Sequence, residues 1–299
     1  MKQHDPRYAD TSPGILEDVL KRVDLAFQAF FRRCKAGEKP GYPRAKGLGW
    51  YKSLTVTRSR EFKLRHEVGE KFGRLSFKGF SGLRVRIHRQ IPEDANVRRV
   101  TIKREANGHW YACFGWDKEM PKSVASGANG AVGVDLGLNN FIATSEGDTV
   151  RSPKCFRHSE QKLRRAQRSL SRKHRRSNRR RKAKERASKL HAKIRNQRKD
   201  FLHNTSRRLV DEHATIGVEK LDVREMLKNP HLAKSISDSG WAEFTHMLAY
   251  KAESAGKTVV LVDPKDTSQI CSGCGEVVEK ALAARTHRCD SCGLFWTET

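Results

Sequence analysis

Apolar residues recur with the period of a helix near the start of the chain and with a period of two further on. Between Ile15 and Phe31 their spacing is helical, which predicts one amphipathic helix. From about residue 50 to 118, short alternating stretches are separated by Gly, Asn and Pro. Such stretches predict a small antiparallel sheet or barrel. The clearest of them are 54–56, 83–87, 100–103 and 110–114.

A second set of strands is more continuously apolar. After a Gly-Ala-Ser linker at 123–130, the stretches 132–137 and 141–144 are separated by a short turn. The stretches 214–219 and 258–263 repeat this pattern further along the chain. Because helical stretches lie between them, we predict a mixed or parallel sheet that is covered on both faces. The chain is therefore expected to be an α+β or α/β protein with several domains.

The segment that separates these strands is strongly basic. Between Arg157 and Lys199 there are 20 Lys or Arg residues and only two acids. Its apolar residues keep a helical spacing, which predicts two helices joined near Ser177 and Asn178. These apolar residues are Leu163, Ala166, Leu170, Ala183, Ala187, Leu190, Ile194 and Phe201. A solvated basic tail is the alternative, although disordered tails rarely keep an apolar stripe.

Charge indicates the kind of partner. The 299 residues include 61 Lys or Arg and 34 Asp or Glu, a net charge of +27 that exceeds what solubility requires. A polyanion is the natural counterpart, and no apolar run is long enough to span a bilayer. In the basic hairpin, we expect nucleic acid to contact Arg164, Arg165, Arg168, Arg172, Lys173, Arg175, Arg176, Arg179 and Arg180. Lys39, Tyr42 and Arg44 form a second candidate in a Gly- and Pro-rich loop, which a plain surface loop explains equally well.

Four cysteines near the end of the chain have the spacing of a zinc ribbon. Cys271 and Cys274 form one Cys-x2-Cys pair, and Cys289 and Cys292 form another after fourteen residues. A Gly follows each pair, which favours a turn whose backbone amides point at the sulfurs of a structural Zn²⁺ site. Two disulfides in a secreted protein are the alternative. The absence of a signal peptide and the scatter of the other cysteines disfavour it and indicate a reducing compartment.

Two of the predicted strands carry a carboxylate at their ends. Asp135 and Glu219 are 84 positions apart, but neighbouring strand ends can bring them together. Carboxylate oxygens suit Mg²⁺, and two metals about 3.5–4 Å apart can support phosphodiester cleavage. Acids that merely cap a strand or pair with Arg would explain the same pattern.

These motifs in combination resemble the RuvC-like nuclease core of the TnpB (OrfB) family of transposon proteins. The matching segments are 37–44, 133–137, 217–221, 263–264, 267–269 and the double Cys-x2-Cys. The resemblance covers nearly the whole chain from about Ile15. It implies an RNA-guided DNA endonuclease, related to type V CRISPR effectors, that binds an RNA from the transposon end and cuts matching DNA beside a short motif. A bacterial or archaeal protein of the cytoplasm, associated with the nucleoid, is expected.

The resemblance also implies roles and a domain layout. Asp135 and Glu219 would be the first two catalytic acids, with Mg²⁺ or Mn²⁺ as cofactor. The basic hairpin would hold the guide–target duplex, and the strands of 50–118 would form a barrel-like module that grips RNA and the target-adjacent motif. Residues 1–13 are expected to be unstructured, and residues 14–46 to form a helix and basic loop that remain from a recognition lobe. A β-rich module is expected at 47–126. An RNase H-like nuclease domain would follow at 127–264, with the hairpin at 157–212, and the zinc ribbon at 265–299.

The chain departs from the family pattern at both ends. Family members usually begin several tens of residues earlier, and a Leu-Asp-Arg-Asp type segment with a third catalytic Asp follows the last zinc cysteine. This chain has Trp296-Thr297-Glu298-Thr299 there, which a one-base shift in the reading frame can produce from codons for that segment. We therefore expect impaired cleavage. The alternatives are a selected, nuclease-dead RNA-guided binder and an unrelated zinc-ribbon RNA-binding protein.

Overall fold

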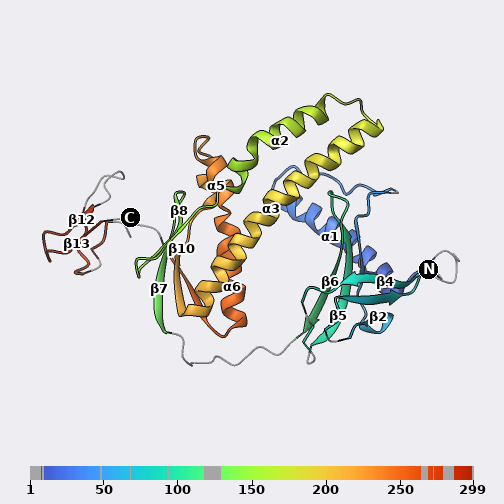
Figure 1. Ribbon diagram of the computed structural model, residues 1–299, viewed down its shortest axis with the longest axis horizontal. Coiled ribbons are helices and arrows are strands. Elements are labelled where there is room, and N and C mark those ends of the chain that lie inside the picture. Colours follow the sequence, from blue (N-terminus) through green and yellow to red (C-terminus); the bar gives the residue numbers. More distant parts are fainter. Residues whose placement is uncertain are drawn as a thin grey trace. The chain divides into compact units, whose positions relative to one another are not determined.

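The computed structural model describes the chain apart from residues 1–7, 9, 48, 68, 90, 93–94, 118–128, 264–268, 272, 279–285 and 298–299. The chain forms two compact units, residues 1–119 and 120–299, which are described separately below (Figure 1). Residues 123–128 of the expected linker and most of the segment 1–13 lie outside the described residues, and residues 129–130 already belong to a strand. None of the helices in the described part combines the length and the apolar character that a membrane span requires.

The first unit contains one long helix and two three-stranded antiparallel sheets. The helix α1 (Pro13–Lys35) confirms the amphipathic helix that the spacing of apolar residues predicts. One sheet has the order β1-β5-β6, and the other has the order β2-β3-β4. Their strands are β1 (Ser53–Val56), β2 (Phe62–Arg65), β3 (Phe72–Phe77), β4 (Phe80–Arg86), β5 (Asn96–Arg104) and β6 (Trp110–Asp117). The alternating pattern predicts β1, β4, β5 and β6, whereas β2 and β3 are new.

Both sheets contribute to one small core. Val56 and Val100 from the first sheet and Leu75 and Phe77 from the second are buried in the same apolar cluster. The first turn of α1 is held to this body by Glu61, whose carboxylate accepts hydrogen bonds from Ser12 Oγ and from the backbone N–H of Gly14. An acid at a helix N-terminus satisfies backbone donors that have no partner within the helix.

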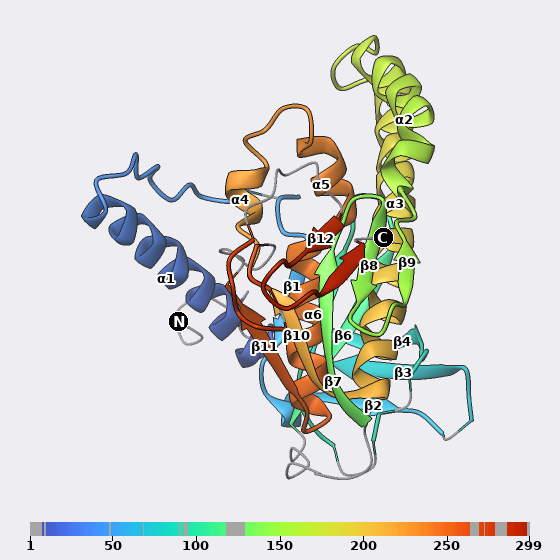
Figure 2. The ribbon, with the colours of Figure 1, turned by 90° about the vertical axis from the view of Figure 1, so that its left-hand side faces the viewer.

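The second unit is built on a five-stranded mixed sheet with the order β11-β10-β7-β8-β9. β7 is parallel to β10, β10 is parallel to β11, and β8 and β9 continue from β7 as antiparallel hairpins. The strands are β7 (Asn129–Leu136), β8 (Asn140–Thr144), β9 (Thr149–Arg151), β10 (His213–Glu219) and β11 (Thr258–Val262). Figure 2 shows β11, β10 and β7 running side by side. The apolar strands thus form a mixed sheet, as predicted.

Helices pack against one face of this sheet. The long helix α3 (Asn178–Glu212) and the helix α6 (Trp241–Ser254) share a core with the strands, on the same side of the sheet (Figure 1). Phe141 of β8 is fully buried there, and its ring meets that of Phe244 edge to face with 4.9 Å between centroids. Edge-to-face rings are a favoured geometry for buried aromatic pairs.

The expectation that helices cover both faces of this sheet is wrong for the described residues. On β7, Val132 and Val134 are buried, while the alternate residues Gly133 and Asp135 are exposed. β7 therefore alternates, and on the face opposite the core it carries a glycine and an acid that offer little apolar area to bury. On the edge strand β11, Val260, Leu261 and Val262 are all exposed, so no helix of the described residues covers them.

The remaining elements connect or follow the sheet. α2 (Cys155–Ser171) pairs with α3, and the short helices α4 (Val223–Met226) and α5 (Ala233–Ser239) lie between β10 and α6 in the sequence. The last two strands, β12 (Thr286–Arg288) and β13 (Phe295–Thr297), form an antiparallel pair near the C-terminus.

Candidate functional site

The structure places Asp135 and Glu219 at the same edge of the sheet. β7 and β10 are parallel and in register up to the pair Val134 and Val218, and each acid is the next residue of its strand. Val134 and Val218 are buried in the core, so the strand alternation directs both carboxylates to the opposite face. Asp135 is exposed and Glu219 is half-buried.

A sharp turn follows immediately after Asp135. Gly137 begins the turn from β7 into β8, and its N–H donates to the carbonyl oxygen of Phe141. A Cβ at Gly137 would lie 2.6 Å from the carbonyl oxygen of Asn140, closer than any side chain can approach. The glycine that follows the acid motif is therefore required by the close return of β8, which closes this end of the sheet beside Asp135.

A third acid lies at the same edge but was not predicted as part of the site. Glu219 pairs with Val262 of β11, and Asp263 is the next residue after that partner. Among the described residues, however, the only group of three or more Cys, His, Asp or Glu side chains close enough to share one ion is formed by cysteines. Asp135 and Glu219 are thus a pair of hard oxygen donors that suits Mg²⁺ or Mn²⁺, and Asp263 lies at the same edge of the sheet.

The four predicted cysteines converge on one point. The possible ligand atoms of Cys271, Cys274, Cys289 and Cys292 all lie within 4.8 Å of one another. Cys271 Sγ is 3.5 Å from Cys292 Sγ, and Cys274 Sγ is 3.5 Å from Cys289 Sγ. All four are free thiols, so the disulfide alternative is not what the structure shows. A cluster of four thiols at this separation can hold a metal such as zinc.

The predicted turns after each cysteine pair are present. Gly275 and Gly293 both have positive φ angles, 78° and 72°, and their N–H groups donate to the carbonyl oxygens of Cys271 and Cys289. Left-handed backbone of this kind favours glycine, which explains its place after the second cysteine of each pair. The N–H groups of Gly273 and Cys274 also point at the sulfur of Cys271.

One residue of this cluster was missed in the sequence. His287 is 1% exposed, and its hydrogen bond to Cys271 is the main reason why the pKa of that thiol is lowered to about 6. The pKa of Cys274 is raised to about 12, because the neighbouring Cys289 thiol and burial outweigh the opposing hydrogen bond from the N–H of Glu276. In the metal-free cluster Cys271 therefore ionises more readily than Cys274, and a metal must displace the proton of the Cys274 thiol to bind it.

The basic segment forms the predicted helical hairpin. α2 and α3 pack through a narrow apolar seam that includes Leu163, Ala183, Ala187 and Ile194, all buried. Ser177 caps α3 by accepting a hydrogen bond from the N–H of Arg180. The junction thus lies where the sequence predicted it, between the C-terminus of α2 and Asn178.

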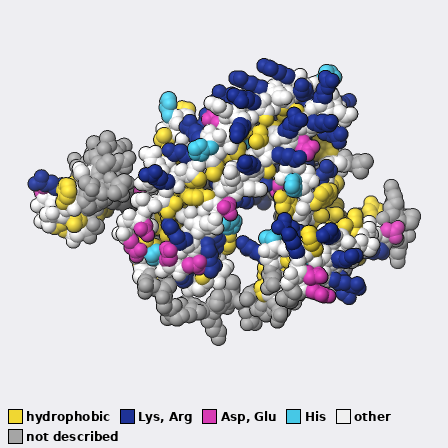
Figure 3. All heavy atoms as spheres, in the orientation of Figure 1, with side chains coloured by type: hydrophobic (Ala, Val, Ile, Leu, Met, Phe, Trp, Pro, Cys, Tyr) yellow, Lys and Arg dark blue, Asp and Glu magenta, His cyan; other side chains and the backbone are white. Residues whose placement is uncertain are grey.

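Most of the cations that we assigned to nucleic acid project from this hairpin. Figure 3 shows Lys and Arg side chains gathered over α2 and the adjoining part of α3. The exposed ones include Arg164, Arg165, Arg168, Arg172, Arg175, Arg176 and Arg179. Lys173 and Arg180 are half-buried, and Arg180 donates to the carbonyl oxygens of Leu170 and Lys173, both at 3.0 Å. Arg180 therefore also closes the hairpin.

The base of the hairpin is held by α5, which sequence analysis did not anticipate. The buried carboxylate of Asp238 accepts hydrogen bonds from the N–H of Phe156, at 2.9 and 3.0 Å, and from that of Arg157. Lys234 pairs with Glu160 at 2.8 Å. Asp238 is separated from Phe156 by 82 residues, so no local signal could reveal this cap of α2.

Removing the Asp238 cap is expected to destabilise the second unit by about 1–2 kcal/mol, because Asp238→Ala leaves two helix N–H groups without their acceptor. Urea unfolding followed by circular dichroism would measure this. Asp200→Ala removes an exposed acid from α3 and serves as the control, with an expected change within about 0.5 kcal/mol. Equal stabilities of the two variants would contradict the anchoring role of Asp238.

The loop after α1 carries the remaining predicted contacts. Lys39, Tyr42 and Arg44 are exposed, and Tyr42 is 69% exposed. Its ring nevertheless contacts the edges of Phe27 and Phe30 of α1, with centroids 5.7 and 5.5 Å apart. The loop is thereby fixed against the helix, with its cations directed to solvent.

Several known proteins and family models are similar to this chain. The family model described as "Probable transposase" (OrfB of IS605) matches residues 118–230, and that of the Cas12f1-like TNB domain matches residues 241–297. A "Putative RNA-guided DNA endonuclease" of Streptomyces pristinaespiralis is 35% identical over 288 residues, which cover 95% of this chain and 68% of the relative. The "Putative RNA-guided DNA endonuclease InsQ" of Escherichia coli (strain K12) is 30% identical, with 94% and 70% covered. In a cryo-electron microscopy structure of a Cas12f1–sgRNA–target DNA complex, one chain is similar with a TM-score of 0.48 at 13% identity, covering 82% of this chain and 61% of that one.

Proposed function

The chain belongs to the OrfB/TnpB family of RNA-guided DNA endonucleases with a RuvC-like core, and from this premise we propose that it is an RNA-guided DNA-binding protein. A net charge of +27 and a cation-covered hairpin support a polyanionic partner. The guide RNA would come from the transposon end, and the complementary DNA would be the target.

The observation that carries this proposal is the α2–α3 hairpin, whose exposed arginines suit a phosphate backbone. The register of β7 and β10 adds a candidate metal site, because it brings Asp135 and Glu219, distant in the sequence, to adjacent positions on the open face of the sheet. Two carboxylates side by side repel each other, and a divalent cation between them relieves that repulsion. When bound, Mg²⁺ or Mn²⁺ can activate water and stabilise the leaving oxygen of a phosphodiester.

We place DNA binding before DNA cleavage for a structural reason. Among the described residues, Asp135 and Glu219 have no third acid or histidine close enough to share an ion with them. Mg²⁺ is commonly bound by one or two carboxylates together with phosphate oxygens, so this pair can hold a cation by the phosphate of a bound strand. Two-metal cleavage also needs a second ion at the same place, and cleavage is therefore the second candidate.

Three finer assignments belong to the same proposal. The two sheets of the first unit would act as a barrel-like module that grips RNA and the target-adjacent motif. The cysteine cluster would hold a structural Zn²⁺, so that 265–299 forms a zinc ribbon. The protein would work in the cytoplasm beside the nucleoid, where its DNA target lies.

Sequencing the RNA that purifies with the protein tests the proposed function. We expect one defined species, and its variable end should predict which DNA the complex retains. DNA duplexes that match or do not match the guide RNA are compared in a filter-binding assay at rising salt concentrations. Matched DNA should stay bound at salt concentrations that release mismatched DNA. A random mixture of cellular RNA, or equal retention of both duplexes, would argue against guided binding.

Asp135→Ala is expected to abolish the thermal stabilisation of the protein by Mg²⁺ or Mn²⁺. In the wild type, a cation at about 100 times its Kd contributes about 2.7 kcal/mol, which corresponds to a rise in Tm of roughly 5–11 °C for a unit of this size. Differential scanning calorimetry with and without the cation measures the rise, and Glu219→Ala should reduce it in the same way.

Asp148→Ala is the matched control for these two variants. Asp148 is an exposed acid in the turn between β8 and β9, and it lies away from the C-terminal ends of β7 and β10. Its removal should leave the cation-dependent rise in Tm unchanged. A rise that survives Asp135→Ala, or that Asp148→Ala removes equally, would show that the cation binds elsewhere.

A further inference from the structure

The outer face of the β2-β3-β4 sheet carries an unusual row of arginines. Arg65 of β2 pairs with Arg74 of β3, and Arg74 pairs in turn with Arg84 of β4. All three are exposed, whereas Leu75, next to Arg74 on the strand, is fully buried. Three arginines thus stand abreast on neighbouring strands. We call Arg65, Arg74 and Arg84 the arginine row.

The rows on either side of the arginine row extend the same chemistry. Arg86 pairs with Phe72 on one side, and Lys63 pairs with Ser76 on the other. The guanidinium of Arg84 lies 3.8 Å above the ring of Phe72, which holds it flat against the sheet. None of the residues in β2, β3 and β4 is acidic, so no carboxylate on these strands neutralises the face.

This arrangement is unfavourable for the protein alone. Like charges directly opposite each other on paired strands destabilise a sheet. A sheet that needed only a solvated outer face could alternate cations with acids or hydroxyls. Anionic groups that lie between the guanidiniums remove the repulsion, and guanidinium forks are well suited to phosphate oxygens. The row therefore has the properties of a site for phosphates.

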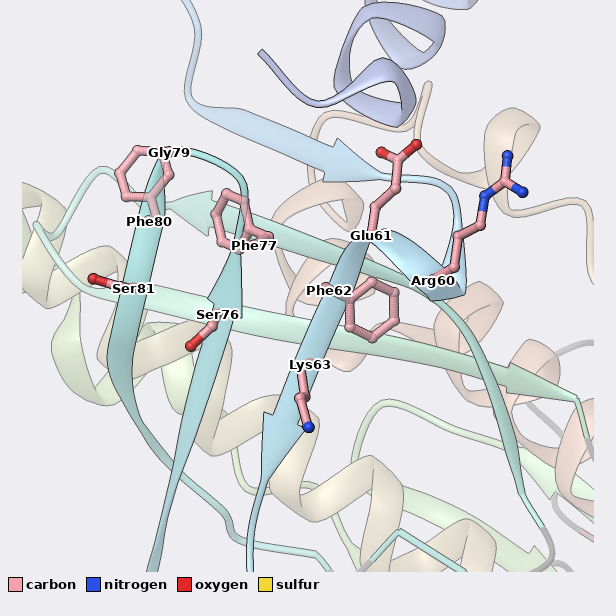
Figure 4. A pocket seen from close by; sticks show the side chains of 9 residues that line it. All are labelled: Arg60, Glu61, Phe62, Lys63, Ser76, Phe77, Gly79, Phe80 and Ser81. Carbon is pink, nitrogen blue, oxygen red and sulfur yellow. The ribbon is translucent and has the colours of Figure 1, made fainter. Parts of the chain in front are cut away.

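A hollow in the surface adjoins this face. Its lining includes Lys63, Ser76, Phe77 and Phe80. Figure 4 shows Lys63 and Ser76 on adjacent strands, with the rings of Phe77 and Phe80 at the β3–β4 turn. Phe80 pairs with the buried Phe77, with 4.9 Å between their ring centroids, and it is 48% exposed, so it presents an aromatic surface at the β3–β4 turn. Lys63 and Ser76 belong to both the hollow and the outer face.

We propose that the outer face of β2-β3-β4 is a binding site for a phosphodiester backbone, with the arginine row at its centre. Neighbouring strands are about 4.8 Å apart, so the row spans roughly 10 Å, which suits successive phosphates better than one free phosphate. The phosphodiester could come from a single strand or from a duplex. This inference deepens the proposed function and rests on it.

The test compares two triple variants with the same loss of charge. The first replaces the row, as Arg65→Gln, Arg74→Gln and Arg84→Gln. The second, Lys21→Gln, Lys52→Gln and Arg98→Gln, removes three exposed cations of the same unit that lie outside β2-β3-β4. Protein freed of nucleic acid is titrated with a short single-stranded RNA, the same sequence as single-stranded DNA, and its DNA duplex. Affinity is measured over a range of salt concentrations.

We expect the row variant to reduce the slope of log affinity against log salt by about 2.7 for the duplex or by about 2.1 for a single strand, which corresponds to three phosphate contacts. The control variant should keep the wild-type slope. The Tm of the row variant without nucleic acid reports on its folding. Because the substitutions remove the repulsion between the arginines, the row variant should be at least as stable as the wild type. Should the row variant unfold, a second variant with Arg65→Lys, Arg74→Lys and Arg84→Lys takes its place. It preserves the charge, so it should keep the slope, and it loses the guanidinium forks, so it should bind more weakly.

A wild-type slope in the row variant would overturn the inference, and so would equal losses in both triple variants. The proposed function fails separately, when wild-type protein binds none of the three probes or retains matched and mismatched DNA equally. Phe80→Ala distinguishes the sources of the phosphodiester. A loss of affinity for single strands alone assigns the site to a strand whose bases stack on Phe80, and a slope that falls in the row variant for the duplex alone assigns it to a duplex backbone.

Discussion

Replacing Cys271 and Cys274 by serine is expected to remove the bound metal and to unfold the C-terminal ribbon. The ligand atoms of the four thiols lie within 4.8 Å of one another. Little else holds this segment together, since its described strands form only one two-stranded ladder, β12–β13. In structural zinc sites the binding free energy, about 10–16 kcal/mol, is also folding free energy. Zinc content by atomic absorption should fall from one ion per chain to nearly none.

The matched control is a double replacement of cysteines outside the cluster. Cys34 and Cys113 are free and exposed, and neither belongs to the four-thiol group. Changing both to serine should leave the zinc content and the protease resistance of the ribbon unchanged. Retention of zinc by the Cys271 and Cys274 variant, or equal loss in the control, would refute the assignment of the metal to this cluster.

Local periodicity predicted most of the elements that carry the candidate site. The helical spacing of apolar residues located α1 and the α2–α3 hairpin, and apolar runs located β7, β10 and β11. Each of these signals depends only on residues a few positions apart. β2 and β3 were not predicted, although Lys63, Arg65 and Arg74 alternate with apolar residues there in the same way as Arg84 and Arg86 do in the predicted β4.

The prediction that helices cover both faces of the mixed sheet was wrong for a related reason. Val132–Gly137 looked like a continuous apolar run, because glycine was counted with the apolar residues. In the structure Gly133 faces away from the core on the same side as Asp135, and a glycine offers no side chain against which a second layer can pack. The same alternation frees this face for the two acids.

Parts of the candidate site that depend on contacts between distant segments could not be predicted. Asp135 and Glu219 were recognisable because each ends an apolar strand, and the parallel pairing then places them together. Asp238 and His287 carry no such signal. Asp238 acts on the first turn of α2, and His287 acts on Cys271, sixteen positions earlier in the chain. Their roles appear only when the fold brings the partners into contact.

The hairpin charges should have the largest effect on nucleic-acid affinity. Arg164, Arg165, Arg168 and Arg172 are exposed along α2, and replacing all four by glutamine removes up to four phosphate contacts. We expect the slope of log affinity against log salt to fall by about 3 units, and the affinity at physiological salt to fall by roughly two orders of magnitude. Fluorescence anisotropy with an RNA–DNA heteroduplex, over a range of salt concentrations, measures both quantities.

Two comparisons decide whether this loss reflects the hairpin surface or net charge alone. Glutamine is a good helix former, so circular dichroism should show unchanged helix content in the four-residue variant. A second variant removes four exposed cations that lie elsewhere, Lys21, Lys52, Arg98 and Lys228, and should keep most of the wild-type slope. If both variants lose affinity equally, the hairpin contributes only to the overall positive potential. If the hairpin variant alone loses it, α2 contacts the phosphates directly, and the Asp238 cap at its base becomes a positioning residue for that contact.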